Sequence, residues 1–421
     1  MNMERVLQTL KTLNEFGVSE DGISRLAYSC EEEKAKYYLI EQCTALGMKT
    51  RIDPAGNVIS RLEGEDDSLP AVAIGSHLDT VYNGGKYDGT LGVVCGLEVI
   101  RAFMEEGIKT RHSIELIAFA CEESARFNVS TIGSKAMIGD IKKDIFRIKD
   151  REGITLKEAL KRQNLDEKEL EKANRIQSEL KSFFELHIEQ GMKLIENKKN
   201  IGLVTGIAAP LRMGLKITGK SSHSGTTGMK ERQDALLAAS ELSLLIEAAA
   251  LKESEYETVG TVGTMEVYPG AINVIPGLVK LKVDIRSSNI SSRNRVVQAL
   301  QKGISQMKDN RGVSVQIEWM MEESPVLMDK ELLKNNVLIC ERLGLDYMFL
   351  SSGAGHDSMN MSKRWPTSLI FVPSVQGLSH HPDEFTELND IEKGLSLLME
   401  MTKEQAIVLM KGEKQHGNKS S

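Results

Sequence analysis

Histidines that stand beside carboxylates are the residues of this sequence best suited to do chemistry. Five of the eight histidines lie in polar or glycine-rich segments next to a carboxylate or a turn: His77, His187, His223, His356 and His380. Neutral imidazole is the commonest metal ligand in proteins, and carboxylates complete sites for divalent ions. None of the five cysteines forms a Cys-x-x-Cys pair, so a cysteine-based zinc site is not expected. The pattern favours a hydrolytic site that holds two divalent ions.

The first of these histidines follows a short apolar strand expected at residues 71–75. Asp79 comes two residues after His77, on the same side of an extended chain, and we expect its carboxylate to accept the second ring N–H of His77. Asp88 follows in a glycine-rich segment that can fold tightly around a metal. An isolated His77 would be better explained as a histidine of a surface turn, so it is the combined pattern that favours metal binding.

Two further strands are expected to end in polar ligands. Glu122 and Glu123 follow an apolar strand at residues 114–120, and burying such a pair is costly unless it has a function. One carboxylate can bind a metal while the other transfers protons. A Glu-Glu pair alone is usually a solvated turn. The strand at residues 183–187 ends in His187, and His380 and His381 lie in a polar segment near the C-terminus.

An α/β architecture is expected to position these residues. Apolar strands alternate with amphipathic helices up to about residue 209, and this order is typical of a sheet built from βαβ units. A charged helical stretch is expected at 155–181. Residues 211–319 predict a separate α+β domain inserted into the first one. The expected helices are 1–16, 31–46, 92–106, 232–251, 292–308 and 332–343, and the expected strands are 48–53, 56–62, 71–75, 114–120, 183–187, 211–222, 260–268, 279–286, 313–319 and 368–373.

Net charge, apolar stretches and cysteine content indicate which partners and which cellular compartment are expected. The formal net charge of −7 argues weakly against nucleic acid and anionic membranes as partners. No signal peptide and no apolar stretch of about 20 residues is expected to direct the chain to or across a membrane. Scattered cysteines fit a reducing compartment, so we expect a cytoplasmic protein. The polar residues after Lys411 are expected to be disordered.

Seven segments together resemble a known family. From residues 22–27 (Gly-Ile-Ser-Arg-Leu-Ala) to residues 380–385, the chain is similar to the amidase, hydantoinase and carbamoylase group of the zinc-aminopeptidase-like superfamily. Within this group it most resembles N-carbamoyl-L-amino acid hydrolases and allantoate amidohydrolases. The resemblance implies a catalytic metal-binding domain at 1–209 and 325–415, with a smaller α+β lid and dimerisation domain at 210–324. It also implies a homodimer.

The resemblance assigns roles around two divalent ions, for which Zn, Mn, Ni and Co are all compatible. His77, together with His380 or His187, caps the metals, Asp88 bridges them, and Glu123 is a further ligand. Glu122 is the general base for the attacking water. The family pattern Ser-His-x-Pro-x-Glu aligns on His380, with His381 as the alternative. Asp79 is expected to orient His77, and the implied metal ligands are His77, Asp88, Glu123, His187 and His380.

The resemblance also implies substrate-binding residues. Residues 222–229 are similar to the family's His-Ala-Gly-Thr-Thr-Pro-Met, in which the histidine, here His223, reaches the partner subunit's site and stabilises the oxyanion. The sequence departs from this pattern at Ser224 and Gly228, and residues 122–127 also differ from the family's Glu-Glu-Gly-Ser-Arg-Phe. These departures leave the choice of substrate open. The implied contacts to the substrate amide, to its α-carboxylate and along a glycine-rich loop are Gln190, Asn273, Arg286, Gly355 and His356.

Plainer explanations exist for three of these residues. Arg286 is alternatively a salt-bridge residue at the rim of a sheet, His356 an anchor to Asp357, and Asn273 a turn residue.

The expected function is hydrolysis of a linear amide C–N bond on a small substrate with a carboxylate, as in an N-carbamoyl-L-amino acid hydrolase. The alternatives are an allantoate amidohydrolase, or an N-acyl-amino acid amidase or dipeptidase. A non-catalytic binding module on the same scaffold is a further alternative, although such a protein is expected to have lost a ligand or the base.

Overall fold

The computed structural model describes residues 1–407, which form two compact units. Unit 1 contains Met1–Thr205, Met328–Leu350 and the described residues from His356 onward, and unit 2 contains Gly206–Leu327 and Ser351–Gly355. The segment after Lys411, for which disorder was expected, lies outside the described residues. No helix within residues 1–407 is both long enough and apolar enough to cross a membrane.

The larger of the two main sheets is mixed and has nine strands. They are β3 (Lys49–Ile52), β4 (Val58–Leu62), β5 (Ala71–His77), β6 (Ile114–Phe119), β7 (Leu180–Ile188), β8 (Ile201–Ile207), β15 (Val326–Leu327), β16 (Tyr347–Ser352) and β17 (Thr367–Val372). Their order is β15-β8-β17-β7-β5-β6-β4-β3, and β16 pairs with β8. Strands β6, β5, β7 and β17 are mutually parallel. Their carboxyl ends therefore meet at one edge of the sheet, where open α/β sheets bind their ligands.

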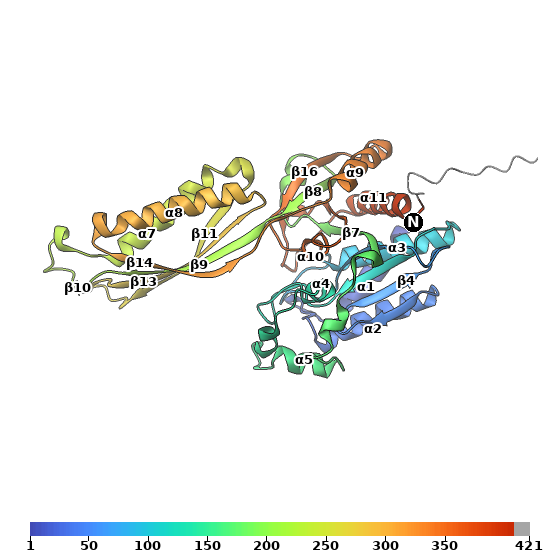
Figure 1. Cartoon of the computed structure of the whole chain (residues 1–421), viewed down its shortest axis with the longest axis horizontal. Helices are drawn as coiled ribbons and strands as arrows, with labels where there is room; N and C mark the ends of the chain where they lie inside the picture. Colours follow the sequence, from blue (N-terminus) through green and yellow to red (C-terminus); the bar gives the residue numbers. More distant parts are fainter. Residues whose placement is uncertain (408–421) are drawn as a thin grey trace, which may run out of the picture. The chain divides into compact units, whose positions relative to one another are not determined.

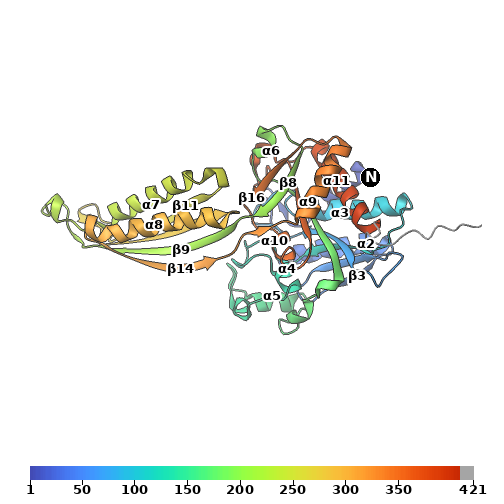
Figure 2. The ribbon, with the colours of Figure 1, turned by 45° about the horizontal axis from the view of Figure 1, so that its top comes forward.

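Helices cover both faces of this sheet (Figures 1 and 2). On one face, α3 (Thr90–Glu105) and α11 (Leu388–Ile407) contact the central strands, α1 (Met3–Glu15) packs on α3, α2 (Cys30–Ala45) contacts β3 and β4, and α9 (Lys330–Leu343) contacts α11. On the other face lie the short helices α4 (Ile132–Met137) and α10 (Ser358–Met361). Smaller elements of unit 1 are β1 (Val18–Ser19), β2 (Gly22–Ile23), α5 (Leu156–Arg162) and α6 (Lys193–Glu196).

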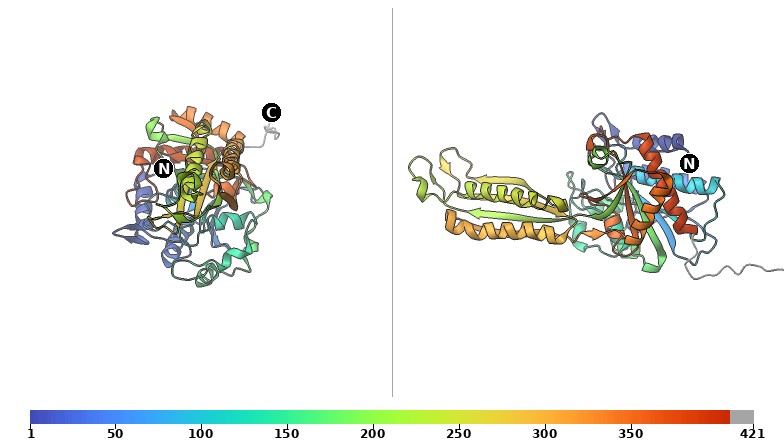
Figure 3. Two further views of the ribbon diagram at one scale, coloured as in Figure 1. Left: turned by 90° about the vertical axis from the view of Figure 1, so that its left-hand side faces the viewer. Right: turned by 90° about the horizontal axis from the view of Figure 1, so that it is seen from above.

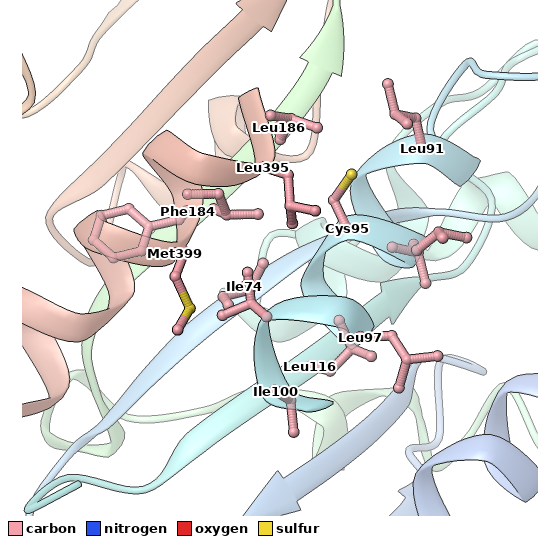
Figure 4. Packing of buried hydrophobic residues seen from close by; sticks show 14 of the residues in the cluster. Ile74, Leu91, Cys95, Leu97, Ile100, Leu116, Phe184, Leu186, Leu395 and Met399 are labelled. Atoms are coloured by element: carbon pink, nitrogen blue, oxygen red, sulfur yellow. The ribbon is translucent and has the colours of Figure 1, made fainter. Parts of the chain in front are cut away.

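The core explains why β5 is buried along its whole length. Successive side chains of a strand point to opposite faces. Ile74 therefore packs with α3 and α11 on one side (Figure 4), whereas Ala73 joins a second cluster with Trp365 on the other side. Glycines allow α3 to lie close to the sheet, since a Cβ on Gly92 would stand 2.2 Å from the Leu186 carbonyl oxygen. The segment that joins β5 to α3 is therefore held by buried elements at both ends.

Unit 2 is a four-stranded antiparallel sheet with two helices on one face (Figures 1 and 3). The strand order is β11 (Val259–Tyr268), β13 (Leu278–Ser287), β9 (Ala209–Thr218) and β14 (Ser314–Glu322). Alternate residues of β9 and β13 are buried against α7 (Ala235–Leu251) and α8 (Ile290–Arg311). A two-residue pairing of β10 (Ser222–His223) with β12 (Val274–Ile275) lies outside this sheet.

The sequence-based expectations differ from the structure in two respects. The continuous charged helix expected at 155–181 is wrong: α5 covers only Leu156–Arg162, and the 3-10 turns Leu170–Ala173 and Gln177–Glu179 follow it. Asn164, just beyond α5, is left-handed with φ of 57°, a conformation that ends a helix. In addition, the sequence patterns did not indicate β8, β16, α4 or α11. The general α/β architecture is confirmed.

Candidate active site

Four loops at the carboxyl edge of the parallel strands bring the candidate ligands together. His77 is the last residue of β5 and His187 lies near the end of β7, while Glu122 and Glu123 follow β6. Asp88 lies just before α3, and the loop after β17 carries His380. All of these residues belong to unit 1. The histidine of each strand is positioned by a strand buried on both faces, so its geometry is largely fixed by the core.

Asp88 stands at the centre of this cluster. Its Oδ1 atom lies 3.4 Å from His77 Nε2 and 3.2 Å from His187 Nε2. Its Oδ2 atom lies 3.4 Å from Nε2 of His380, which is also 3.1 Å from Glu123 Oε1. Asp88 therefore presents one oxygen to each of two groups of potential ligands, and within each group the ligand atoms lie within 4.8 Å of one another. A shared carboxylate of this kind suits two adjacent cations.

Backbone carbonyls orient the two strand histidines. His77 Nδ1 lies 2.9 Å from the Asp79 carbonyl oxygen, and His187 Nδ1 lies 2.9 Å from the Ile188 carbonyl oxygen. An Nδ1–H that donates to a carbonyl leaves Nε2 with its lone pair, the form that binds a metal. The Gly89 N–H donates to His187 Nε2 at 3.1 Å, which is consistent with this tautomer.

The expected contact between the Asp79 carboxylate and His77 requires correction. The carboxylate oxygen is 3.8 Å from His77 Nδ1. The hydrogen bond of that nitrogen is instead made with the Asp79 backbone carbonyl oxygen. The carboxylate instead accepts the backbone N–H groups of Glu122 at 3.2 Å and Glu123 at 3.0 Å. Asp79 is thus linked to His77 through its main chain and to the Glu122–Glu123 turn through its side chain.

The two acidic residues Glu122 and Asp88 have opposite electrostatic environments. Burial would raise the pKa of Asp88, but the surrounding His187, His380 and His77 outweigh burial and hold that pKa well below its ordinary value. Burial raises the pKa of Glu122 well above its ordinary value, and neighbouring Glu123 adds to this effect against the opposing His77. Carboxylates whose pKa values are pushed apart in one site are suited to different tasks, one as an ionised ligand and one as a proton carrier.

Gln190 lies against the cluster, next to Ser379 and close to Glu384, two residues for which the sequence predicted no role. Its Nε2 donates to Asp88 Oδ2 at 2.7 Å and to Ser379 Oγ at 3.1 Å. Ser379 in turn lies 2.8 Å from Asp88 Oδ2, and buried Glu384 accepts the backbone N–H of Asp88. The only sequence signal for these two residues was their place in the Ser-His-x-Pro-x-Glu pattern around His380.

His356 is buried behind the strand histidines. Its ring packs against the His187 ring, with 4.5 Å between centroids, and against Phe371 at 5.5 Å. Burial and the neighbouring His187 lower the pKa of His356 well below its ordinary value. The carboxylate of Asp357, the alternative anchor for His356, accepts a hydrogen bond from Ser134 Oγ. His356 thus lies beside the cluster, with its ring packed on that of His187.

The remaining substrate-binding candidates lie in unit 2. His223 is exposed on β10, which pairs with β12, and the neighbouring Ser224 N–H donates to the Asn273 carbonyl oxygen at 3.0 Å. The pairing of β10 with β12 thus brings His223 and Asn273 close together in space. The Gly225 N–H donates to His223 Nδ1 at 3.1 Å.

Arg286 lies on β13, and a salt bridge holds its guanidinium. Its Nε and Nη2 atoms donate to Asp284, which also pairs with Arg212, and Nη1 donates to the Gly353 carbonyl oxygen at 3.2 Å. Gly353 belongs to the same exposed loop as Gly355, where an added Cβ would meet no atom within 4 Å. Both the salt-bridge explanation and the substrate-binding explanation for Arg286 fit this geometry.

Comparison with known proteins agrees with this geometry. Residues 73–404 match the sequence model of the family described as "Peptidase family M20/M25/M40". The N-carbamoyl-L-amino acid amidohydrolase of Geobacillus stearothermophilus is 39% identical, with 94% of this chain and 96% of the relative covered. The allantoate amidohydrolase of Escherichia coli K12 is 33% identical, with 94% and 96% covered.

A solved structure extends the likeness to the fold. The crystal structure of an amidase of the hydantoinase/carbamoylase family from Burkholderia multivorans superposes with a TM-score of 0.88 at 31% identity, covering 97% of this chain and 99% of the other. The chain is an enzyme, an amidohydrolase that acts on C–N amide bonds. On these matches, it belongs to peptidase family M20/M25/M40.

Proposed function

We propose that this amidohydrolase is a two-metal enzyme that removes the carbamoyl group from an N-carbamoyl-L-amino acid. The observation that carries the proposal is the position of Asp88 between two ligand groups, with Glu122 at the edge of the same cluster. The Geobacillus relative, named for this reaction, supports the choice of substrate. Allantoate hydrolysis is the alternative, supported by the Escherichia coli relative.

The residues of the cluster fit a pair of divalent ions. Buried carboxylates are costly unless cations compensate them, and three of them, Asp88, Glu122 and Glu123, lie here with histidine nitrogens. Hydrogen bonds to Asp88 and Glu123 raise the pKa of His380 to about 11, which shows how strongly this pocket favours positive charge. One ion would be held by His77, Asp88 and His187, and the other by Asp88, Glu123 and His380.

The chemistry of the proposed reaction is divided between ions and protein. Divalent ions held by these residues would supply Lewis-acid polarisation of the scissile carbonyl and would acidify the attacking water. Glu122 takes the proton of that water and delivers it to the leaving nitrogen. The Glu122 carboxylate lies 3.8 Å from His77 Nε2 and belongs to neither ligand group that contains Asp88, which supports its use for proton transfer. A carbamoyl substrate then yields an amino acid, ammonia and carbon dioxide.

Unit 2 is proposed to supply the polar contacts to the substrate. The hydrogen bond from Gly225 to His223 Nδ1 leaves Nε2 as the N–H donor of the ring, which supports a role in stabilising the oxyanion. Asp284 and Gly353 engage three of the five N–H groups of Arg286, and one N–H on each terminal nitrogen is left for a carboxylate. Gln190 and Asn273 are proposed to contact the amide.

We further propose a homodimer in which unit 2 forms the interface. Helix α7 exposes Leu237, Leu244 and Leu251 at seven-residue spacing, so these side chains share one face of the helix. The helix contacts β11, which is an edge strand of the unit 2 sheet. The stripe lies on the face of α7 opposite its buried residues, and an exposed apolar stripe of this kind is suited to self-complementary pairing with a second copy.

Ammonia release from N-carbamoyl-L-methionine and from allantoate, measured side by side after loading with Mn²⁺ or Zn²⁺, tests the substrate assignment. We expect turnover of the carbamoyl compound. Turnover of allantoate alone would establish the alternative. Turnover of neither, in protein confirmed to hold two ions, would contradict both. Parallel assay of N-acetyl-L-methionine, which releases acetate and no ammonia, covers the acyl amidases.

A further inference from the structure

A buried carboxylate connects the two loops that carry the central ligand and the most exposed ligand. Glu384, 2% exposed, lies four residues after His380 in the loop that follows β17. Its Oε1 atom accepts the backbone N–H of Tyr87 at 2.8 Å and that of Asp88 at 3.0 Å. Two backbone donors offset part of the cost of burying this charge. The carboxylate thus ties the His380 loop to the Asp88 loop.

A second contact follows the same path. Ser379 Oγ lies between the two carboxylates, 2.8 Å from Asp88 Oδ2 and 3.2 Å from Glu384 Oε2, and its single hydrogen can be donated to either one. The loops approach so closely that a Cβ on Gly85 would lie 2.3 Å from the Glu384 Cβ. Glycine at position 85 is therefore required for Glu384 to reach the backbone of the Asp88 loop.

The two ligand groups depend on this link to different degrees. His77 and His187 lie on buried strands and are oriented by their own neighbouring carbonyls. By contrast, His380 is about half exposed, has a left-handed backbone with φ of 57°, and lies on a loop. The position of His380 relative to Asp88 therefore depends on the contacts between the loops.

We propose that Glu384 is a positioning residue that holds Asp88 and His380 in register and thereby sets the affinity for the ion shared by Asp88, Glu123 and His380. The inference rests on the proposed two-metal function. Residues that orient a metal ligand typically change metal affinity by roughly 10- to 100-fold when removed. The ion held by His77, Asp88 and His187 keeps both of its strand histidines and should be affected much less.

The test is calorimetric titration of chelator-treated full-length protein with Mn²⁺, together with kcat measured over a range of Mn²⁺ concentrations. Glu384→Ala should bind one ion as the wild type does and the other roughly 10- to 100-fold more weakly, with kcat recovering at high Mn²⁺. Glu384→Gln should restore most of the affinity, because its amide oxygen can still accept both backbone N–H groups. Asp383→Ala, which removes an exposed carboxylate from the same loop, is the matched control and should match the wild type.

Three results would overturn the inference. Binding of both ions to Glu384→Ala as in the wild type would do so, as would equal weakening of both ions with a lowered Tm that high Mn²⁺ does not rescue. If Glu384→Ala does not fold, Ser379→Ala decides: the same ion should weaken by roughly 3- to 10-fold, and no change would overturn the inference. Failure of the wild type itself to bind two ions is a distinct result, which would overturn the proposed function first and this inference with it.

Discussion

At the scale of single residues, the decisive contrast is between buried carboxylates that must stay ionised and one that can carry a proton. Asp88 is surrounded by three histidines that hold its pKa down, whereas burial raises the pKa of Glu122. The distance between Glu122 Oε2 and His77 Nε2, 3.8 Å, places the proposed base beside the first ligand group. The roles proposed for the two acids are therefore separable, and substitutions can test them one at a time.

Glu122→Gln should lower kcat by roughly 100- to 10,000-fold, the usual contribution of a positioned general base. The amide keeps the size of the side chain and leaves the ligands of both groups in place, so bound metal should not change. Steady-state kinetics and metal analysis on the same preparation measure both quantities. An unchanged kcat would remove Glu122 from the proton transfer.

Arg286→Ala should raise KM for a carboxylate substrate by roughly 10- to 100-fold, because a charged hydrogen-bonded pair is lost. The same substitution should have little effect on an analogue whose carboxylate is capped as an amide. Kinetics with both compounds separate binding of the carboxylate from a general effect of the broken Asp284 pair. Equal effects on the two compounds would favour the purely structural salt bridge.

At the scale of elements, the carboxyl ends of β5, β6 and β7 explain why the sequence indicated residues that the fold brings together as candidate ligands. Each is an apolar strand followed at once by a polar ligand, and both features lie within a few residues of each other. The contacts of Asp79 could not be found in this way. The strand ends at His77, so the alternation of an extended chain no longer applies two residues later.

Longer-range partners were even less accessible from the sequence. Glu384 contacts the Tyr87 and Asp88 backbone almost 300 residues earlier in the chain. No local pattern encodes that approach, which depends on the parallel order of the strands and on the conformation of two loops. The prediction of a continuous helix beyond residue 162 failed for a local reason. Asn164 adopts a left-handed conformation that ends the helix, although the charge pattern continues.

The junction between β5 and α3 provides a sharp test of the local geometry. Gly89 has φ of 62° and ψ of −51°, and a Cβ there would lie 2.4 Å from the His77 ring. Gly89→Ala should therefore disturb the ligand group of His77 and lower metal affinity. Gly107→Ala is the matched control, since Gly107 has φ of 64° and nothing within 4 Å of an added Cβ.

Gly107→Ala should cost roughly 1–2 kcal/mol of backbone strain, since alanine is unfavourable at positive φ. Gly89→Ala should cost more because of the close approach to His77. Thermal unfolding measures both costs, and titration with Mn²⁺ isolates the effect on metal affinity at Gly89. Equal metal affinity in the two variants would contradict the geometry derived for the His77 site.

At the scale of the whole molecule, the residues assigned to the proposed reaction are distributed over both units. Unit 1 holds the ligand cluster and Glu122, while unit 2 holds His223, Asn273 and Arg286. If His223 acts on the site of the partner subunit, as the family resemblance implies, two inactive variants can restore each other in a mixed dimer.

Mixing His223→Ala with Glu122→Gln should recover activity, because in a mixed dimer one site combines an intact Glu122 with an intact His223 from the partner. Random exchange of subunits predicts roughly a quarter of the wild-type rate per chain. Differently tagged subunits allow mixed dimers to be isolated and assayed. No recovery in verified mixed dimers would show that His223 does not act across the interface.

On the proposed mechanism, catalysis needs two ions held by the Asp88 cluster. The most direct test of this requirement is to strip the protein with a chelator, reload it stepwise with Mn²⁺ or Zn²⁺, and record bound metal per chain together with ammonia release from N-carbamoyl-L-methionine. We expect no turnover without metal, full turnover as the second ion binds, and failure of Asp88→Ala to retain two ions. Undiminished turnover by metal-free protein would contradict the proposed mechanism.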